Sequence, residues 1–119
     1  FGRDEEYMVS AFDIDWSWKH KVPGKGGWMS PVPTTVPDLA AAMTMNPGLH
    51  VLVQQGWYDL ATPFLATKMD LEHLNITPEA RKRIQLEHYD AGHMMYVHEP
   101  SMQKFRDDLV GFIRATDRL

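Results

Sequence analysis

The chain has 119 residues, of which 44% are hydrophobic, and its formal net charge is −4. This length suits a single domain with a core of its own, and the acidic balance gives no electrostatic reason to expect nucleic acid or an anionic membrane as a partner. Cysteine is absent, which excludes disulfide bonds, thiol catalysis and thiolate metal sites within these residues, and no apolar run approaches the roughly 20 residues that a bilayer-spanning helix needs.

The first part of the chain, residues 1–36, is expected to form an extended arm followed by a connector. Apolar and polar residues alternate over 12–19, which is the period of a strand with one buried face. From Val22 to Pro37, prolines and glycines are dense enough to interrupt both helix and sheet, which predicts a loop. Because the sequence opens on Phe1 rather than methionine, we also expect further sequence upstream of it.

The second part, residues 37–119, is expected to alternate helices and strands. Pro37 suits the first turn of a helix, Asp38 there favours the helix dipole, and the Asn-Pro-Gly at 46–48 ends the helix. The apolar run that follows, 49–55, predicts a buried strand.

A second helix, a second strand and a last helix complete the predicted order. Thr62 is a favourable cap and is followed by proline, so the second helix is expected over about 63–73. Residues 84–89 predict another strand, and the last helix is expected to begin at Ser101. The apolar side chains of that helix fall on one face: Met102, Phe105, Leu109, Phe112 and Ile113.

The order of helix, strand, helix, strand and helix predicts an α/β fold. Two strands joined by a crossover helix are expected to lie parallel, with a right-handed connection and with helices packed on the sheet. Parallel strands are normally buried on both faces and flanked by further strands. We therefore expect chain outside these residues to complete the sheet.

Two turns hold the side chains that point to chemistry. Asp59 follows the first predicted strand by a few residues, and His93 follows the second in the same way. The carboxyl ends of parallel strands meet at one edge of a sheet, where neighbouring strands are about 4.8 Å apart, so these two side chains can come into contact. A carboxylate would then hold the imidazole in one tautomer and leave its other nitrogen to take a proton from a serine hydroxyl.

The segments NPGLHVLVQQGWYDLATPF and YDAGHMMYVHEPSM, together with the final amphipathic helix, resemble the C-terminal region of the bacterial serine carboxypeptidases. The resemblance covers more than half of the chain, and its most specific element is the Ala-Gly-His-Met around His93. It implies an α/β-hydrolase fold, with Asp59 and His93 as the catalytic acid and histidine. It also implies the release of C-terminal residues from peptides through an acyl-enzyme, without a cofactor, in an enzyme that is exported or works in an acidic compartment.

The nucleophile elbow of that family, Gly-x-Ser-x-Gly, does not occur in the sequence. No serine is flanked by glycines as an elbow requires; the four are Ser10, Ser17, Ser30 and Ser101. We therefore expect the nucleophilic serine to come from upstream sequence or from a partner chain, and the isolated chain to be inactive. A non-catalytic α/β domain that keeps the scaffold for binding or assembly is the rival hypothesis.

Each candidate residue also has a less specific interpretation. Asp59 suits a turn or a helix cap, and His93 could be a histidine of the core. Asp90 competes for the role of acid, although it lies in the same loop as His93. No metal site is expected, because no pair of histidines has the helical spacing of a zinc motif with a local acid. By position, a hydrophobic substrate pocket would be lined by Trp57, Tyr58, Met94 and Met95.

Overall fold

The computed structural model describes residues 17, 19–27, 29, 30 and 34–117. The chain divides into two compact units, Phe1–Thr34 and Thr35–Leu119. Among the described residues no helix combines the length and the apolar character that crossing a bilayer requires.

The first unit contains an antiparallel pair of short strands, β1 (His20–Lys21) and β2 (Met29–Ser30). The predicted loop from Val22 to Pro37 therefore contains a short strand, β2, that was not predicted. The glycines explain the difference, because Gly24, Gly26 and Gly27 have positive φ angles of 72°, 58° and 87° and reverse the chain between the two strands. Of the strand predicted over 12–19, only Ser17 and Lys19 are described, and neither is in a strand; the rest lies outside the described residues.

The second unit confirms the predicted order of helices and strands. It runs α1 (Val36–Met45), β3 (Val51–Gly56), α2 (Phe64–Glu72), α3 (Pro78–Arg81), β4 (Ile84–Tyr89), η1 (Met95–Val97) and α4 (Glu99–Thr116). Two short elements were not predicted, α3 and the 3₁₀ helix η1. The helix α3 forms because the Thr77 side chain accepts a hydrogen bond from the Ala80 N–H at 3.1 Å, and proline occupies its first position.

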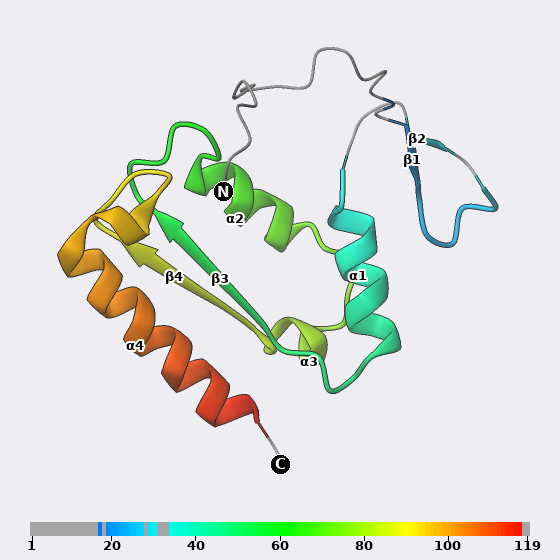
Figure 1. Cartoon of the computed structure of the whole chain (residues 1–119). Coiled ribbons are helices and arrows are strands. Elements are labelled where there is room, and N and C mark those ends of the chain that lie inside the picture. The colour runs from blue at the N-terminus through cyan, green and yellow to red at the C-terminus, as the bar shows by residue number, and fades with distance from the viewer. Residues whose placement is uncertain (1–16, 18, 28, 31–33, 118–119) are drawn as a thin grey trace, which may run out of the picture. The chain divides into compact units, whose positions relative to one another are not determined.

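The sheet of this unit is an open pair of parallel strands with flanking helices, as predicted. Its register runs from Val51 opposite Ile84 to Gly56 opposite Tyr89. Figure 1 shows α4 on one side of the strand pair and α1 and α2 on the other. Side chains of a strand point alternately to the two faces, so each face meets a different set of helices.

Tyr89 is the centre of the contact between the sheet and α4. It is 2% exposed and packs in the core with Ala91 and Met95, against Phe105 of α4. Its hydroxyl accepts a hydrogen bond from Gln54 Nε2 at 2.7 Å and donates one to an oxygen of Asp108 at 2.9 Å. Three other members of the predicted apolar face, Met102, Leu109 and Ile113, remain 36–49% exposed. A sheet of two strands is too narrow to cover the whole stripe of an 18-residue helix.

Arg83 ties the amino end of β4 to the carboxyl end of α1. Its Nη1 donates to the carbonyl oxygens of Asn46 and Leu49 at 2.9 and 2.7 Å, and its Nη2 donates to that of Met43 at 2.9 Å. Carbonyl groups at a helix end have no partner within the helix, and a cation there also favours the dipole. One guanidinium therefore joins α1, the start of β3 and β4 at the end of the sheet opposite to the turns that follow β3 and β4.

Candidate active site

The two turns that follow β3 and β4 are held together by main-chain hydrogen bonds. The Trp57 N–H donates to Tyr89 O at 2.9 Å, and the Tyr58 N–H donates to Ala91 O at 3.0 Å. Gly56 lies where the backbones come closest, since a Cβ atom there would sit 2.3 Å from the carbonyl oxygens of both Ala91 and Gly92. Only glycine permits this approach, which positions the residues that follow on the two strands.

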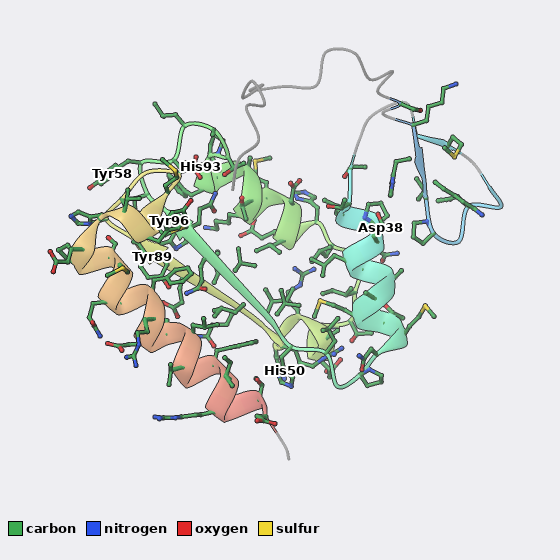
Figure 2. The ribbon with its side chains drawn as sticks, in the orientation of Figure 1. Asp38, His50, Tyr58, Tyr89, His93 and Tyr96 are labelled. Atoms are coloured by element: carbon green, nitrogen blue, oxygen red, sulfur yellow. The ribbon has the colours of Figure 1, made fainter. Side chains whose placement is uncertain are left out.

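Asp59 and His93 meet at this edge of the sheet. The Nδ1 atom of His93 lies 3.0 Å from Oδ2 of Asp59. The Asp59 side chain is 3% exposed, whereas that of His93 is 60% exposed. Figure 2 shows His93 near the carboxyl ends of the strands, at the same end as Tyr58 and Tyr96, and His50 at the opposite end. The structure therefore brings together the two residues predicted as acid and histidine.

Hydrogen bonds keep the buried Asp59 carboxylate ionised. The Thr62 hydroxyl donates to Oδ2 at 2.6 Å, and the N–H groups of Thr62 and Ala61 donate to Oδ1 at 2.8 and 2.9 Å. The hydroxyl of Thr62, then its N–H, hold the pKa of Asp59 well below the ordinary value of 3.8; burial acts in the opposite direction. A carboxylate with this set of donors stays charged at neutral pH.

The contact with the carboxylate determines what His93 can do. An ionised carboxylate only accepts hydrogen bonds, so the Nδ1 atom facing it holds the proton. In the neutral imidazole this leaves Nε2 as the basic nitrogen. No described residue makes a hydrogen bond to Nε2. The pair is thus arranged so that Nε2 can accept a proton while Asp59 stabilises the resulting imidazolium.

Two other residues, Asp90 as the acid and Ser101 as the nucleophile, fit these roles less well. Asp90, the competing acid, is exposed, and the carboxylate at Nδ1 of His93 belongs to Asp59. Ser101 is 5% exposed, and its hydroxyl lies 2.7 Å from Nδ1 of His98. Burial and this contact make Ser101 unsuitable as a nucleophile for His93.

The four residues predicted to line a substrate pocket differ in environment. Tyr58 and Met94 are 66% and 54% exposed. Trp57 stacks on His88, with ring centroids 3.9 Å apart. Trp57 also lines a cavity of about 200 Å³. Met95 is only 9% exposed and belongs to the core around Tyr89, where it has a packing role. The pocket itself stays a prediction.

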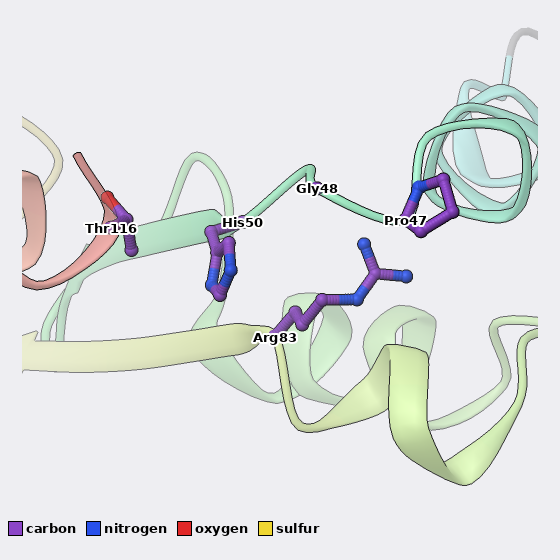
Figure 3. A pocket seen from close by; sticks show the side chains of 5 residues that line it. All are labelled: Pro47, Gly48, His50, Arg83 and Thr116. Atoms are coloured by element: carbon purple, nitrogen blue, oxygen red, sulfur yellow. The ribbon is translucent and has the colours of Figure 1, made fainter. Parts of the chain in front are cut away.

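A larger cavity, of about 380 Å³, lies at the other end of the strands (Figure 3). Pro47, Gly48, His50, Arg83 and Thr116 line it. Its one strongly basic group, the Arg83 guanidinium, is already bonded to main-chain carbonyls, so this cavity belongs to the junction of α1 and β4. Within the described part of the chain, no group of three or more potential metal ligands could hold an ion.

The sequence alone did not predict that Thr62 binds the Asp59 carboxylate or that Gly56 allows the two turns to approach closely. Thr62 was predicted to cap the second helix, but Pro63 is the N-cap of α2 and no side chain caps it. The Thr62 hydroxyl instead donates to Asp59, three residues earlier. The Asp-x-x-Thr spacing is the only sequence signal for this bond, and it is common to turns and caps in general.

Comparison with known proteins adds no family assignment. The chain matches no protein-family model, no curated protein and no solved structure. The resemblance of its two turns to those of serine carboxypeptidases therefore stays a prediction.

Proposed function

We propose that this chain supplies the acid and the general base of a Ser-His-Asp triad. The observation that supports the proposal is the 3.0 Å contact between a buried, ionised Asp59 and Nδ1 of an exposed His93, at the carboxyl ends of two parallel strands. In open parallel sheets, ligands bind at this edge. The order of acid before histidine along the chain is that of α/β-hydrolases.

In the proposed reaction, the oxygen of a serine hydroxyl attacks the substrate carbonyl while His93 Nε2 takes the hydroxyl proton. The imidazolium is stabilised by Asp59 and gives the proton to the leaving amine, which breaks the scissile bond and leaves an acyl-enzyme. A water molecule then attacks the ester carbon and loses a proton to His93. The bond between the serine oxygen and the acyl carbon breaks, His93 returns the proton to the serine oxygen, and the product acid leaves. Asp59 remains ionised throughout.

The finer part of the proposal is that the substrate is a peptide that loses its C-terminal residue. Its support is the resemblance of the two turns to the serine carboxypeptidases. In this proposal, residues 37–119 are the C-terminal portion of an α/β-hydrolase domain, and the serine comes from upstream sequence or from a partner chain. The open pair of parallel strands agrees with a sheet to which further strands are added.

Labelling of the complete protein with a fluorophosphonate tests the proposal, because this reagent forms a stable bond with an activated serine. We expect labelling of the wild type and its loss in His93→Ala. His73→Ala is the matched control, since His73 is exposed and its Nδ1 lies 2.7 Å from Met69 O in α2. Release of the terminal residue from a blocked dipeptide then tests the substrate class. A wild type without labelling or hydrolysis would favour the non-catalytic binding domain.

A further inference from the structure

We propose that Thr62 is a positioning residue, whose hydroxyl fixes the rotation of the Asp59 carboxylate so that Oδ2 faces His93. The assignment of a catalytic purpose to this contact rests on the proposed function. The geometry is a compact triangle of three atoms. Thr62 Oγ1 lies 2.6 Å from Asp59 Oδ2, His93 Nδ1 lies 3.0 Å from the same oxygen, and Oγ1 lies 3.4 Å from Nδ1.

The partners of Asp59 fill its acceptor sites. A carboxylate has about four lone-pair sites, two on each oxygen. Oδ1 accepts the N–H groups of Ala61 and Thr62, and Oδ2 meets the Thr62 hydroxyl and His93. The two main-chain donors act on Oδ1 alone. Apart from His93 itself, the Thr62 hydroxyl is therefore the group in the described residues that holds Oδ2.

The proton of the Thr62 hydroxyl is committed to this bond. A short hydrogen bond to an ionised oxygen is among the stronger ones, and a hydroxyl has only one proton to donate. Towards His93 the hydroxyl thus presents only lone pairs. The Nδ1 proton of His93 faces two acceptors and no competing donor, which keeps Nε2 as the free base. The stiff χ1 angle of a β-branched residue helps to hold the hydroxyl in place.

Neither core packing nor capping of α2 accounts for the Thr62 side chain. The residue is exposed, so it is not part of the core, and its hydroxyl does not cap α2. Its main chain is anchored separately, because Gln55 Nε2 donates to Thr62 O and the Thr62 N–H donates to Asp59. Replacement by valine keeps the shape and the main-chain bonds and removes the hydroxyl alone.

The first experiment measures kcat and KM of the complete protein for release of the C-terminal residue from a blocked dipeptide. We expect Thr62→Val to lower kcat by about 10- to 100-fold with KM unchanged, as for the loss of one hydrogen bond to a charged group. Thr62→Ser keeps the hydroxyl and should restore most of the activity. Thr44→Val is the matched control and should leave kcat unchanged; its hydroxyl donates at 2.7 Å to Ala40 O, within α1.

The second experiment needs no activity. In the proton NMR spectrum, the Nδ1 proton of His93 should give a downfield signal, identified by its loss in His93→Ala. We expect Thr62→Val to speed the exchange of this proton with water, and Thr62→Ser and Thr44→Val to leave it near the wild-type rate.

The two experiments separate the two proposals. If the wild type neither hydrolyses the dipeptide nor reacts with the fluorophosphonate, the proposed function fails, and the exchange rate alone decides whether Thr62 positions the pair. Wild-type kinetics and wild-type exchange in a folded Thr62→Val protein would overturn the inference. A fall in kcat that Thr62→Ser does not restore would also overturn it, because the hydroxyl would not be the cause.

Discussion

Replacing Gly56 by alanine should separate the two turns that follow β3 and β4. The added Cβ would lie 2.3 Å from the carbonyl oxygens of Ala91 and Gly92 and 2.9 Å from the Ala91 carbonyl carbon. Carbon and oxygen atoms normally approach to about 3.3 Å, so the backbones must move apart by roughly 1 Å. All three atoms belong to the main chain, so no side-chain rotation can relieve the contact.

This displacement should lower both the stability of the protein and its turnover. Overpacking of this kind destabilises a protein by about 1–3 kcal/mol. Each kcal/mol lowers Tm by roughly 4–8 °C in a domain of 60–100 residues and by roughly 2–4 °C in one of 150–250 residues. A shift of about 1 Å in a catalytic group can reduce turnover by about 100-fold, so the loss of activity should exceed what the loss of stability explains.

Thermal unfolding followed by circular dichroism, with kcat measured well below Tm, tests this reasoning. Gly111→Ala is the matched control, because a Cβ there meets nothing within 4 Å and Gly111 lies within α4. Alanine is favoured over glycine inside a helix by about 0.5–1 kcal/mol, so the control should raise Tm. A Gly56→Ala protein with the Tm and kcat of the wild type would refute the close approach of the two turns.

Two further predictions concern Asp59 and Tyr89. Asp59→Asn should lower kcat by about 10⁴-fold, as in serine proteases whose histidine is held in the wrong tautomer, while the fold stays intact by circular dichroism; near-normal turnover would exclude Asp59 as the acid. Tyr89→Phe removes the hydroxyl between Gln54 and Asp108 and should lower the free energy of unfolding by about 1–2 kcal/mol in urea titrations. Burial raises the pKa of Tyr89 from 10.0 to about 12, so the stability it contributes is complete below pH 10 and is lost as the pH rises from 10 to 12. Tyr89→Phe should therefore weaken the decline of stability over that interval, and an unchanged decline would argue against the buried hydroxyl as its cause.

Asp59 and His93 differ in burial, and the difference suits them to different roles in the proposed reaction. Asp59 is withdrawn from solvent and bonded on every side, which fixes its charge and its orientation. His93 keeps an open side, which a proton-transfer group requires. In the proposed function this pair supplies the acid and the base, and the nucleophile comes from chain outside the described residues.

Local patterns in the sequence were enough to predict most elements of the second unit. The alternation of apolar residues, the proline at helix starts and the Asn-Pro-Gly at 46–48 act over a few residues, so they can be recognised without the fold. The same is true of the two turns, because ligands and catalytic groups gather in the turns that follow the carboxyl ends of parallel strands. The hairpin of β1 and β2 was missed, because glycines interrupt a strand or join two strands depending on the φ angles they adopt.

The sequence by itself determined the order of helices and strands, the parallel pairing and the identity of Asp59 and His93 as candidates. Only the tertiary structure decided that Asp59, and not Asp90, faces Nδ1 of His93, because that choice depends on the register of two strands distant in the chain. It also decided that Gly56 must be glycine and that the Thr62 hydroxyl holds a carboxylate instead of capping a helix. The contacts of Asp59 and Gly56 depend on distances of a few ångströms between separate segments, which no local pattern of residues encodes. The Thr62 bond is local, but its Asp-x-x-Thr spacing is common to turns and caps and does not predict the bond.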